Sequence, residues 1–175
     1  MALIAASPAC AGVEQWRSLI EAASARSGVP ASWIEQVMHS ESRGNVAAVS
    51  SKGALGLMQL MPQTWNELRF SLALGPDPFE PSDNILAGAF YLRSMYEKFG
   101  YPGLFAAYNA GPRRYAEHLS GGRRLPIETR AYVEAVSGRR AAIIASPLPF
   151  TGEFRRNVAP RKSSLFFELS APARQ

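Results

Sequence analysis

Residue types that build several common sites are scarce in this chain of 175 residues. Its single cysteine, Cys10, excludes an internal disulfide framework. Two distant histidines, His39 and His118, together with that cysteine are too few for a structural zinc site, which needs four grouped nitrogen and sulfur ligands. No run of about 18 apolar residues occurs, so the sequence predicts no transmembrane helix. No internal repeat, phosphate-binding glycine loop or dinucleotide-binding motif is present either.

An excess of charge is also missing from most of the chain. Lysine and arginine outnumber aspartate and glutamate by 19 to 14, which gives a formal net charge of +5. Residues 1–138 contain equal numbers of basic and acidic side chains, so the whole excess lies in residues 139–175. A neutral body argues against a nucleic-acid partner, because binding along phosphates needs a basic surface. We therefore distinguish a body over residues 13–138 from a basic, proline-interrupted C-terminal extension over residues 139–175.

Residues 1–12 form a short N-terminal segment of small and apolar residues. Ala9-Cys10-Ala11 resembles the cleavage site of a secretory signal. However, no basic residue precedes Arg17, and the apolar stretch is too short for a complete signal. The segment is interpreted either as the remnant of an export signal or as an ordinary chain terminus.

The body consists of predicted short helices separated by glycine and proline. Apolar residues at helical spacing predict a first helix from Val13 to near Gly28 and a second from Pro30 to about Ser42. Residues 43–55 are rich in glycine, serine and alanine and predict a loop with at most short strands. Further helices are expected at 62–70 and 85–99. Three short helices follow, with Pro102, Pro112 and Pro126 just inside their starts, and the last of them ends near Ser137. The predicted fold class is mainly α.

One acidic residue extends the apolar face of the second predicted helix. The apolar stripe of this helix consists of Trp33, Ile34, Val37 and Met38, and a step of four residues from Val37 leads to Glu41. Burial raises the pKa of a carboxyl group, which is the change that a general acid working near neutral pH needs. Alternatively, the helix ends at this point and the stripe leaves the core. Periodicity alone leaves both interpretations open.

Two further polar positions interrupt apolar or small residues. Gln59 is the one amide in the apolar run 56–62, and it is either a core group bonded to the backbone or a donor and acceptor for a substrate. Tyr108 and Asn109 stand among small residues that allow a ligand to approach closely. The same pattern also fits an ordinary helix C-terminus capped by Gly111.

Taken in order, these motifs resemble those of the soluble lytic transglycosylase (SLT) family. The resemblance rests on Glu41-Ser42, on Ser50 with Gly53, and on residues 56–62, 84–92, 107–111 and 126–133. It extends over about residues 22–136 and implies a lysozyme-like fold, with short helices around a glycan-binding cleft of an enzyme that cleaves peptidoglycan. Asn45 is followed by Val46 where many relatives have proline, and this departure concerns only a loop.

The resemblance implies that Glu41 is the catalytic residue. It would protonate the oxygen that links N-acetylmuramic acid (MurNAc) to N-acetylglucosamine (GlcNAc) and then take a proton from the MurNAc C6 hydroxyl, which leaves a 1,6-anhydro end. This reaction uses no metal and no cofactor. The acid content agrees with it, because a hydrolytic glycosidase usually needs a second carboxylate and the sequence has no acid between Glu41 and Glu67. Glu128 is expected to have a structural role at a helix start.

The resemblance also implies two contacts close to the catalytic carboxyl group. The hydroxyl of Tyr132 would hold or orient the Glu41 carboxyl. Ser50 would bond either to that carboxyl or to the acetamido group of the sugar.

Four other residues are implied to bind the glycan. Gln59 and Tyr108 would bond to sugar hydroxyls and amides, while Met61 and Tyr108 would offer apolar surface to a sugar ring. Asn109 belongs to the same set, although its type is better suited to fixing the backbone of its own turn. Each of these residues can alternatively have an ordinary role in the core or in a turn.

Three functions therefore remain open at this point: a lytic transglycosylase, a hydrolytic muramidase on the same fold, and a catalytically silent peptidoglycan-binding assembly module. The expected partner is the glycan strand of peptidoglycan, which would place the protein in the periplasm or cell envelope. The basic extension over residues 139–175 is expected either to pack irregularly on the body or to bind a partner. The candidate partners are an anionic envelope surface and an envelope-spanning secretion or conjugation machine.

Overall fold

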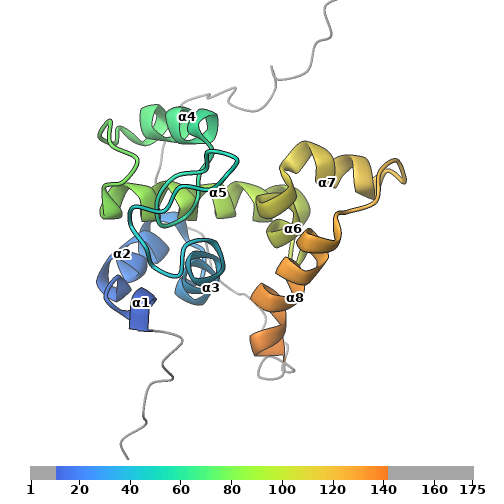
Figure 1. The fold of residues 1–175 in the computed structure, drawn as a ribbon, viewed down its shortest axis with the longest axis horizontal. Coiled ribbons are helices and arrows are strands. Elements are labelled where there is room, and N and C mark those ends of the chain that lie inside the picture. Colours follow the sequence, from blue (N-terminus) through green and yellow to red (C-terminus); the bar gives the residue numbers. More distant parts are fainter. Residues whose placement is uncertain (1–10, 142–175) are drawn as a thin grey trace, which may run out of the picture.

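The computed structural model of the protein describes residues 11–141, which form helices joined by loops (Figure 1). This described part has no regular strand and only two isolated bridges, which pair Leu55 with Val49 and with Leu60. The mainly α class is therefore confirmed, and the short strands allowed for residues 43–55 are reduced to these bridges. The helices are α1 (Ala11–Glu14), α2 (Arg17–Ser27), α3 (Ala31–Glu41), α4 (Pro62–Leu72), α5 (Pro81–Phe99), α6 (Gly103–Ala110), α7 (Pro112–Leu119) and α8 (Ile127–Ala141).

The long helix α5 lies at the centre of the fold. It packs against α2, α3, α4 and α6, and Figure 1 shows α4 on one side of it and α2 with α3 on the other. Residues 84–89 of α5 are all buried, as are Leu92 and Met95. A helix covered by neighbours on several sides must be apolar around most of its circumference, which explains why its apolar residues are more than a single stripe.

Two residues of α5 hold the loop between α3 and α4 against the core. The side chain of Asn84 is fully buried; it accepts a hydrogen bond from the Met58 N–H at 2.7 Å and donates to the carbonyls of Leu55 (3.2 Å) and Pro78 (2.7 Å). A Cβ at Gly88 would lie 2.6 Å from the Cβ of Met58, so the loop approaches α5 at a distance that only glycine permits. Because a buried amide is satisfied in one arrangement, these contacts position the loop that carries Gln59.

The last helices return the chain to α3. Helix α6 packs on α5, α7 and α8, and α8 also packs on α3. Val136, in the middle of α8, is buried. The end of α3 and the face of α8 therefore meet, although they lie far apart in the sequence.

The first predicted helix is in fact two helices. Helix α1 ends at Glu14 and α2 begins at Arg17, with Trp16 between them at φ −96° and ψ 4°. The indole N–H of Trp16 donates a hydrogen bond of 3.0 Å to the carbonyl of Gly44, in the loop after α3. The prediction of one continuous helix was wrong because this tertiary contact needs a turn at a position where the apolar periodicity shows none.

The proline positions are close to the predicted ones. Pro112 is the first residue of α7, as expected. Pro30 and Pro102 are instead the residues just before α3 and α6, and Pro126 precedes α8, which continues past Ser137 to Ala141. Such shifts of one residue are usual at helix ends. Among residues 11–141, no helix has both the length and the apolar character needed to cross a membrane.

Candidate active site

Glu41 is the last residue of α3. It therefore stands at a helix end and also continues the core face of the helix, the two positions that the sequence left open as alternatives. Its neighbours on the stripe, Ile34, Val37 and Met38, are fully buried, and the Glu41 carboxyl is itself largely enclosed. This burial raises the pKa of Glu41 to about 7, from an ordinary value near 4.5. A carboxyl group with this pKa is populated in both its acid and its base form near neutral pH.

The backbone reverses direction directly after Glu41. The N–H groups of Ser42 and Arg43 both bond to the carbonyl of Met38, at 3.0 and 3.1 Å, and Arg43 and Gly44 have positive φ angles. The backbone of Gly44 lies against that of Gly12 so closely that a Cβ at Gly44 would overlap the Gly12 carbonyl. The end of α3 is therefore held in place by α1 as well as by its own core face.

Tyr132 lies beside the Glu41 carboxyl, on the face of α8 that meets α3. Its hydroxyl is buried and makes no hydrogen bond of full geometry to any residue in the described part of the chain. It is nevertheless close enough to favour the ionised form of Glu41, which partly opposes the upward shift of the Glu41 pKa. Burial and the negative charge of Glu41 in turn raise the pKa of Tyr132 well above its usual value. The structure thus brings together the two residues that were expected to act as a pair.

Tyr108 is buried in the core behind this pair. Its hydroxyl donates a hydrogen bond of 2.8 Å to the carbonyl of Met58, and its ring packs against that of Tyr91 with the centroids 5.1 Å apart. Burial, with the charge of Glu41 as the second cause, raises the pKa of Tyr108 well above its usual value. Tyr108 is therefore near Glu41, but its proton is engaged by the loop and only its oxygen lone pairs remain for a ligand.

The side chain of Gln59 is turned toward its own loop. Its amide nitrogen donates to the carbonyls of Ala48 at 3.0 Å and Gly56 at 2.8 Å, and Gln59 itself has a φ of +48°. Both amide hydrogens are thus used, in agreement with the alternative in which the amide bonds to the backbone. Only the Gln59 carbonyl oxygen is left to accept a hydrogen bond.

The side chains of Ser50 and Asn109 both bond to other parts of the protein. The Ser50 hydroxyl oxygen accepts hydrogen bonds from the N–H groups of Ala54 (2.9 Å) and Lys52 (3.3 Å) and closes a turn. The side-chain oxygen of Asn109 accepts a hydrogen bond of 2.9 Å from the Thr129 hydroxyl, which joins α6 to α8. The expectation that Asn109 fixes its own turn was wrong, because its partner belongs to another helix.

Met61 and Glu128 lie at exposed positions. Met61, just before α4, is 46% exposed and offers apolar surface. Glu128, in the first turn of α8, is solvent-exposed and forms an ion pair of 3.5 Å with Lys52 of the loop. No second carboxyl group of the described residues shifts the pKa of Glu41. Residues 11–141 also contain no group of three or more His, Cys, Asp or Glu side chains that would hold a metal ion.

A family model described as the transglycosylase SLT domain matches residues 18–129. The chain belongs to this SLT domain family. It is 38% identical over 117 residues to a soluble lytic murein transglycosylase of Escherichia coli K12, an alignment that covers 62% of this chain and 18% of that protein. It is also 38% identical over 89 residues to a transglycosylase of Enterobacteria phage PRD1, which covers 51% and 32% of the two chains.

The fold agrees with this SLT family membership. The crystal structure of the 70 kDa soluble lytic transglycosylase of Escherichia coli superimposes with a TM-score of 0.61 at 33% identity, over 69% of this chain and 22% of the other. The expected lysozyme-like SLT fold is therefore confirmed. The chain spans only about a fifth to a third of the length of these relatives.

Three supporting residues of the SLT domain were not predicted in their roles. Asn84 anchors the loop, Thr129 holds Asn109, and Lys52 pairs with Glu128. Asn84 alone had a local signal, since it is a polar residue that begins an apolar helical stripe. The other two pairings join separate elements and have no signature in the local sequence.

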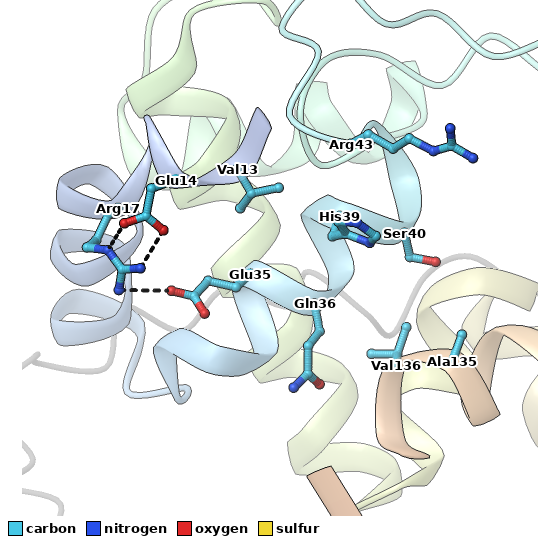
Figure 2. Close-up of a pocket in the computed structure, with 10 residues that line it drawn as sticks. All are labelled: Val13, Glu14, Arg17, Glu35, Gln36, His39, Ser40, Arg43, Ala135 and Val136. Carbon is cyan, nitrogen blue, oxygen red and sulfur yellow. Dashed lines mark hydrogen bonds and ion pairs between the residues drawn. The ribbon is translucent and has the colours of Figure 1, made fainter. Parts of the chain in front are cut away.

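A pocket of about 430 Å³ lies against α3 (Figure 2), and Glu41 is not among its lining residues. It is lined by the polar face of α3 with Glu35, Gln36, His39 and Ser40, by Arg43, by α1 and α2, and by Ala135 and Val136 of α8. None of the expected site residues lines it. This pocket is therefore separate from the group of residues around Glu41.

Proposed function

We propose that this chain is a lytic transglycosylase that cleaves the bond between MurNAc and GlcNAc in peptidoglycan, with Glu41 acting as acid and then as base. The observation that carries the proposal is the burial of the Glu41 carboxyl at the end of α3, which raises its pKa to about 7. Membership in the SLT family and the names of the relatives support the same substrate class.

In the first step, protonated Glu41 donates its proton to the glycosidic oxygen as the bond from MurNAc C1 to that oxygen breaks. The acetamido oxygen of the same MurNAc bonds to C1 in place of the leaving oxygen and gives an oxazolinium-like species. The Glu41 carboxylate then accepts the proton of the C6 hydroxyl while the C6 oxygen bonds to C1 and the acetamido oxygen leaves. Glu41 ends protonated, no water is consumed, and the product carries a 1,6-anhydro ring.

The neighbouring residues have distinct roles in this proposal. Tyr132 orients the Glu41 carboxyl and favours its ionised form in the second step. The oxygen of Gln59 and the hydroxyl hydrogen of Ser50, which the loop does not use, bond to the acetamido or hydroxyl groups of the glycan. Met61 provides apolar surface, the oxygen of Tyr108 accepts a hydrogen bond from the glycan, and Asn109 joins α6 to α8.

Hydrolysis on the same site is the less favoured reaction. An inverting or retaining hydrolase needs a second carboxylate within about 10 Å of the acid to activate water or to attack C1. Burial and the Tyr132 hydroxyl account for the pKa of Glu41, and the sequence has no acidic residue between Glu41 and Glu67. A reaction in which the substrate supplies its own nucleophile fits this arrangement better.

The place of action and a protein partner are also part of the proposal. The substrate places the enzyme in the periplasm or cell envelope. The basic residues of the C-terminal extension, five of which follow α8 from Arg155 onward, are proposed to contact an envelope-spanning secretion or conjugation machine. The uneven charge of the chain supports this, since the body to residue 138 carries no net charge.

Mass spectrometry of digested peptidoglycan tests the reaction. The protein is expected to release fragments that end in 1,6-anhydro-MurNAc; reducing MurNAc ends would show a hydrolase instead. Glu41→Gln should abolish release, whereas Glu35→Gln, on the same helix but facing away from the site, should not. If Glu41→Gln releases fragments as fast as the unmodified protein, the catalytic assignment is wrong.

A further inference from the structure

The pocket behind α3 lies between the first and last helices of the described part. Its apolar surface comes from Val13 of α1 and from Ala135 and Val136 of α8. Figure 2 shows these residues on opposite sides of the face of α3 that carries His39 and Ser40. A volume of about 430 Å³ is within the usual range for sites that hold a side chain cluster or a small ligand.

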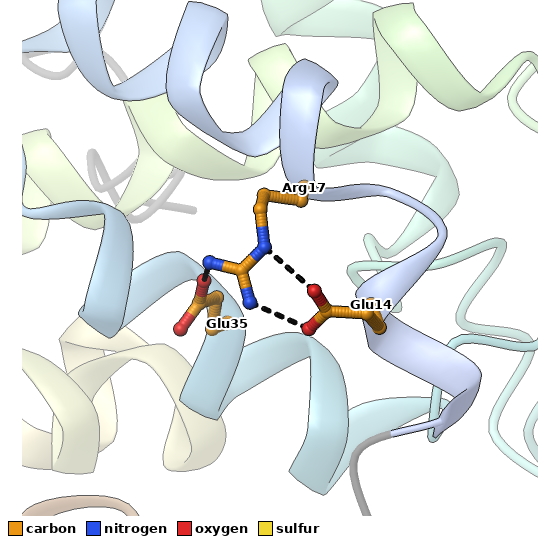
Figure 3. A network of polar contacts seen from close by, with 3 residues as sticks. All are labelled: Glu14, Arg17 and Glu35. Carbon is orange, nitrogen blue, oxygen red and sulfur yellow. Dashed lines mark hydrogen bonds and ion pairs between the residues drawn. The ribbon is translucent and has the colours of Figure 1, made fainter. Parts of the chain in front are cut away.

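The charged side chains at one end of this pocket, Glu14, Arg17 and Glu35, already pair with one another. Arg17 bonds through Nε to Glu14 at 2.8 Å and through Nη1 reaches Glu35 at 3.7 Å, so one guanidinium bridges two carboxylates from different helices (Figure 3). Because these side chains are partly or largely exposed, the network contributes little stability. Because the charges of these three residues are paired, this end of the pocket does not favour a charged ligand.

The remaining wall has unused hydrogen-bonding capacity next to apolar surface. The side chains of Gln36, Ser40 and Arg43 have no hydrogen bond or ion pair to another residue within 11–141. Such a surface, with an apolar floor and free donors and acceptors, fits a peptide segment that brings both apolar side chains and backbone groups. It fits a sugar or a highly charged ligand less well.

We propose that residues 142–154 of this chain occupy this pocket. They directly follow α8, whose residues 135 and 136 form one of its walls. They contain no basic residue and a single acidic one, and their large apolar side chains are Ile143, Ile144, Leu148, Phe150 and Phe154. Thirteen residues reach about 40 Å when extended, which is ample for a return along α8.

The composition of the two ends of the chain favours this occupant over residues 1–10. Residues 1–10 directly precede α1, which lines the pocket, but they contain no aromatic and no charged side chain. Glu153 can meet the guanidinium of Arg43, which has no carboxylate partner among the described residues. The basic residues from Arg155 onward then remain free for a partner.

Occupation of the pocket would brace the contact between α3 and α8. Ser40 directly precedes Glu41, and Val136 lies one helical turn beyond Tyr132 on the same helix. A segment wedged between them would hold the two helices at a set distance and so position the Glu41–Tyr132 pair. The docking itself does not depend on the proposed reaction.

Hydrogen–deuterium exchange of the full chain, followed by mass spectrometry of its peptides, tests the docking. Amides in residues 142–154 are expected to exchange at least about 10-fold more slowly than those of an unstructured chain. Exchange at the unstructured rate would overturn the proposal. Protection of residues 1–10, with none in 142–154, would show the other occupant and overturn it equally.

A pair of matched variants locates the contact. Ala135→Arg places a long charged side chain in the pocket and should remove at least about 10-fold of the protection in residues 142–154. Ala131→Arg, an exposed alanine of the same helix outside the pocket, should leave it unchanged. Equal effects of the two variants would contradict the assignment.

A disulfide provides a second measurement that does not enlarge a side chain in the pocket. In a Cys10→Ser background, Ser40→Cys with Phe150→Cys should cross-link on mild oxidation, because a disulfide needs Cα atoms within about 7 Å. Ser71→Cys with Phe150→Cys, with the first cysteine on the exposed side of α4, should not. Equal yields would overturn the proposal.

Discussion

The hydroxyl of Tyr108 donates a hydrogen bond of 2.8 Å to the main-chain carbonyl of Met58. This bond joins α6 to the loop between α3 and α4, and the N–H of the same residue, Met58, is held by Asn84 of α5. Both polar groups of one buried peptide residue are thus satisfied by side chains of different helices. The loop behind Glu41 is therefore a rigid part of the core.

Removal of the Tyr108 hydroxyl should destabilise the fold. Tyr108→Phe keeps the ring but leaves the Met58 carbonyl without its donor, which should lower the free energy of unfolding by about 1–3 kcal/mol. Urea denaturation followed by circular dichroism measures this. Tyr115→Phe is the matched control, because its hydroxyl has no hydrogen bond to another described residue. Similar losses in the two variants would show that the bond to Met58 contributes little.

The rate of glycan cleavage should depend on the protonation of Glu41. Because burial places its pKa near 7, kcat/KM is expected to be constant in mildly acidic solution and to fall about tenfold per pH unit above 7. The hydroxyl of Tyr132 lowers this pKa, so Tyr132→Phe should move the decline to higher pH. A decline at an unchanged pH in Tyr132→Phe would contradict the proposed interaction of the two residues.

The same carboxyl group should make stability depend on pH. In the unfolded chain Glu41 ionises near pH 4.5, but in the folded protein it keeps its proton until about pH 7. The folded state therefore binds more protons between these values, and stability should decrease as pH rises through this window. The loss of stability by pH 8 is about 3 kcal/mol.

Glu41→Gln should remove this dependence, because glutamine does not ionise. Compared with the unmodified protein, the variant should be similarly stable at pH 4 and more stable at pH 8. Glu35→Gln, on the other face of α3, should keep the original profile. Thermal unfolding at several pH values separates the two, and parallel profiles for all three proteins would argue against a buried Glu41.

The close approach of α1 to the loop after α3 should make Gly44 sensitive to substitution. Gly44→Ala combines a positive φ of 81° with a steric overlap with the Gly12 carbonyl. Gly53→Ala has nearly the same φ, 83°, but no atom within 4 Å of the new Cβ. The backbone conformation alone should cost about 1–2 kcal/mol in each, and Gly44→Ala should cost clearly more. Equal free energies of unfolding would mean that α1 moves away without penalty.

Much of the helical framework could be predicted from local pattern. The apolar spacing in α3 and α5 predicted both helices, because burial of one helix face imposes a period that is visible in the sequence. It put Glu41 in line with the core face of α3 but left open whether the helix ends there and the apolar stripe leaves the core. The split between α1 and α2 could not be predicted, since it serves the bond from Trp16 to Gly44. The hydrogen-bond partners of Gln59 and Asn109 could not be predicted either. A polar side chain can bond to many donors and acceptors, and the packing of the chain decides which of them lie close to it.

By itself, the sequence determined the mainly α class, the family and the carboxyl group to which the chemistry is assigned. The class follows from residue types at short, regular spacing, whereas the family and the role of this carboxyl group are implied by the resemblance of the ordered motifs to the SLT family. Only the tertiary structure decided that Tyr132 of α8 lies beside Glu41 and that Tyr108 and Gln59 donate their hydrogen bonds to carbonyls of the loop. The pocket lined by α1, α2, α3 and α8 is likewise a result of the tertiary structure. These contacts join helices to one another or fold a loop onto the core, and their geometry depends on how the whole chain packs.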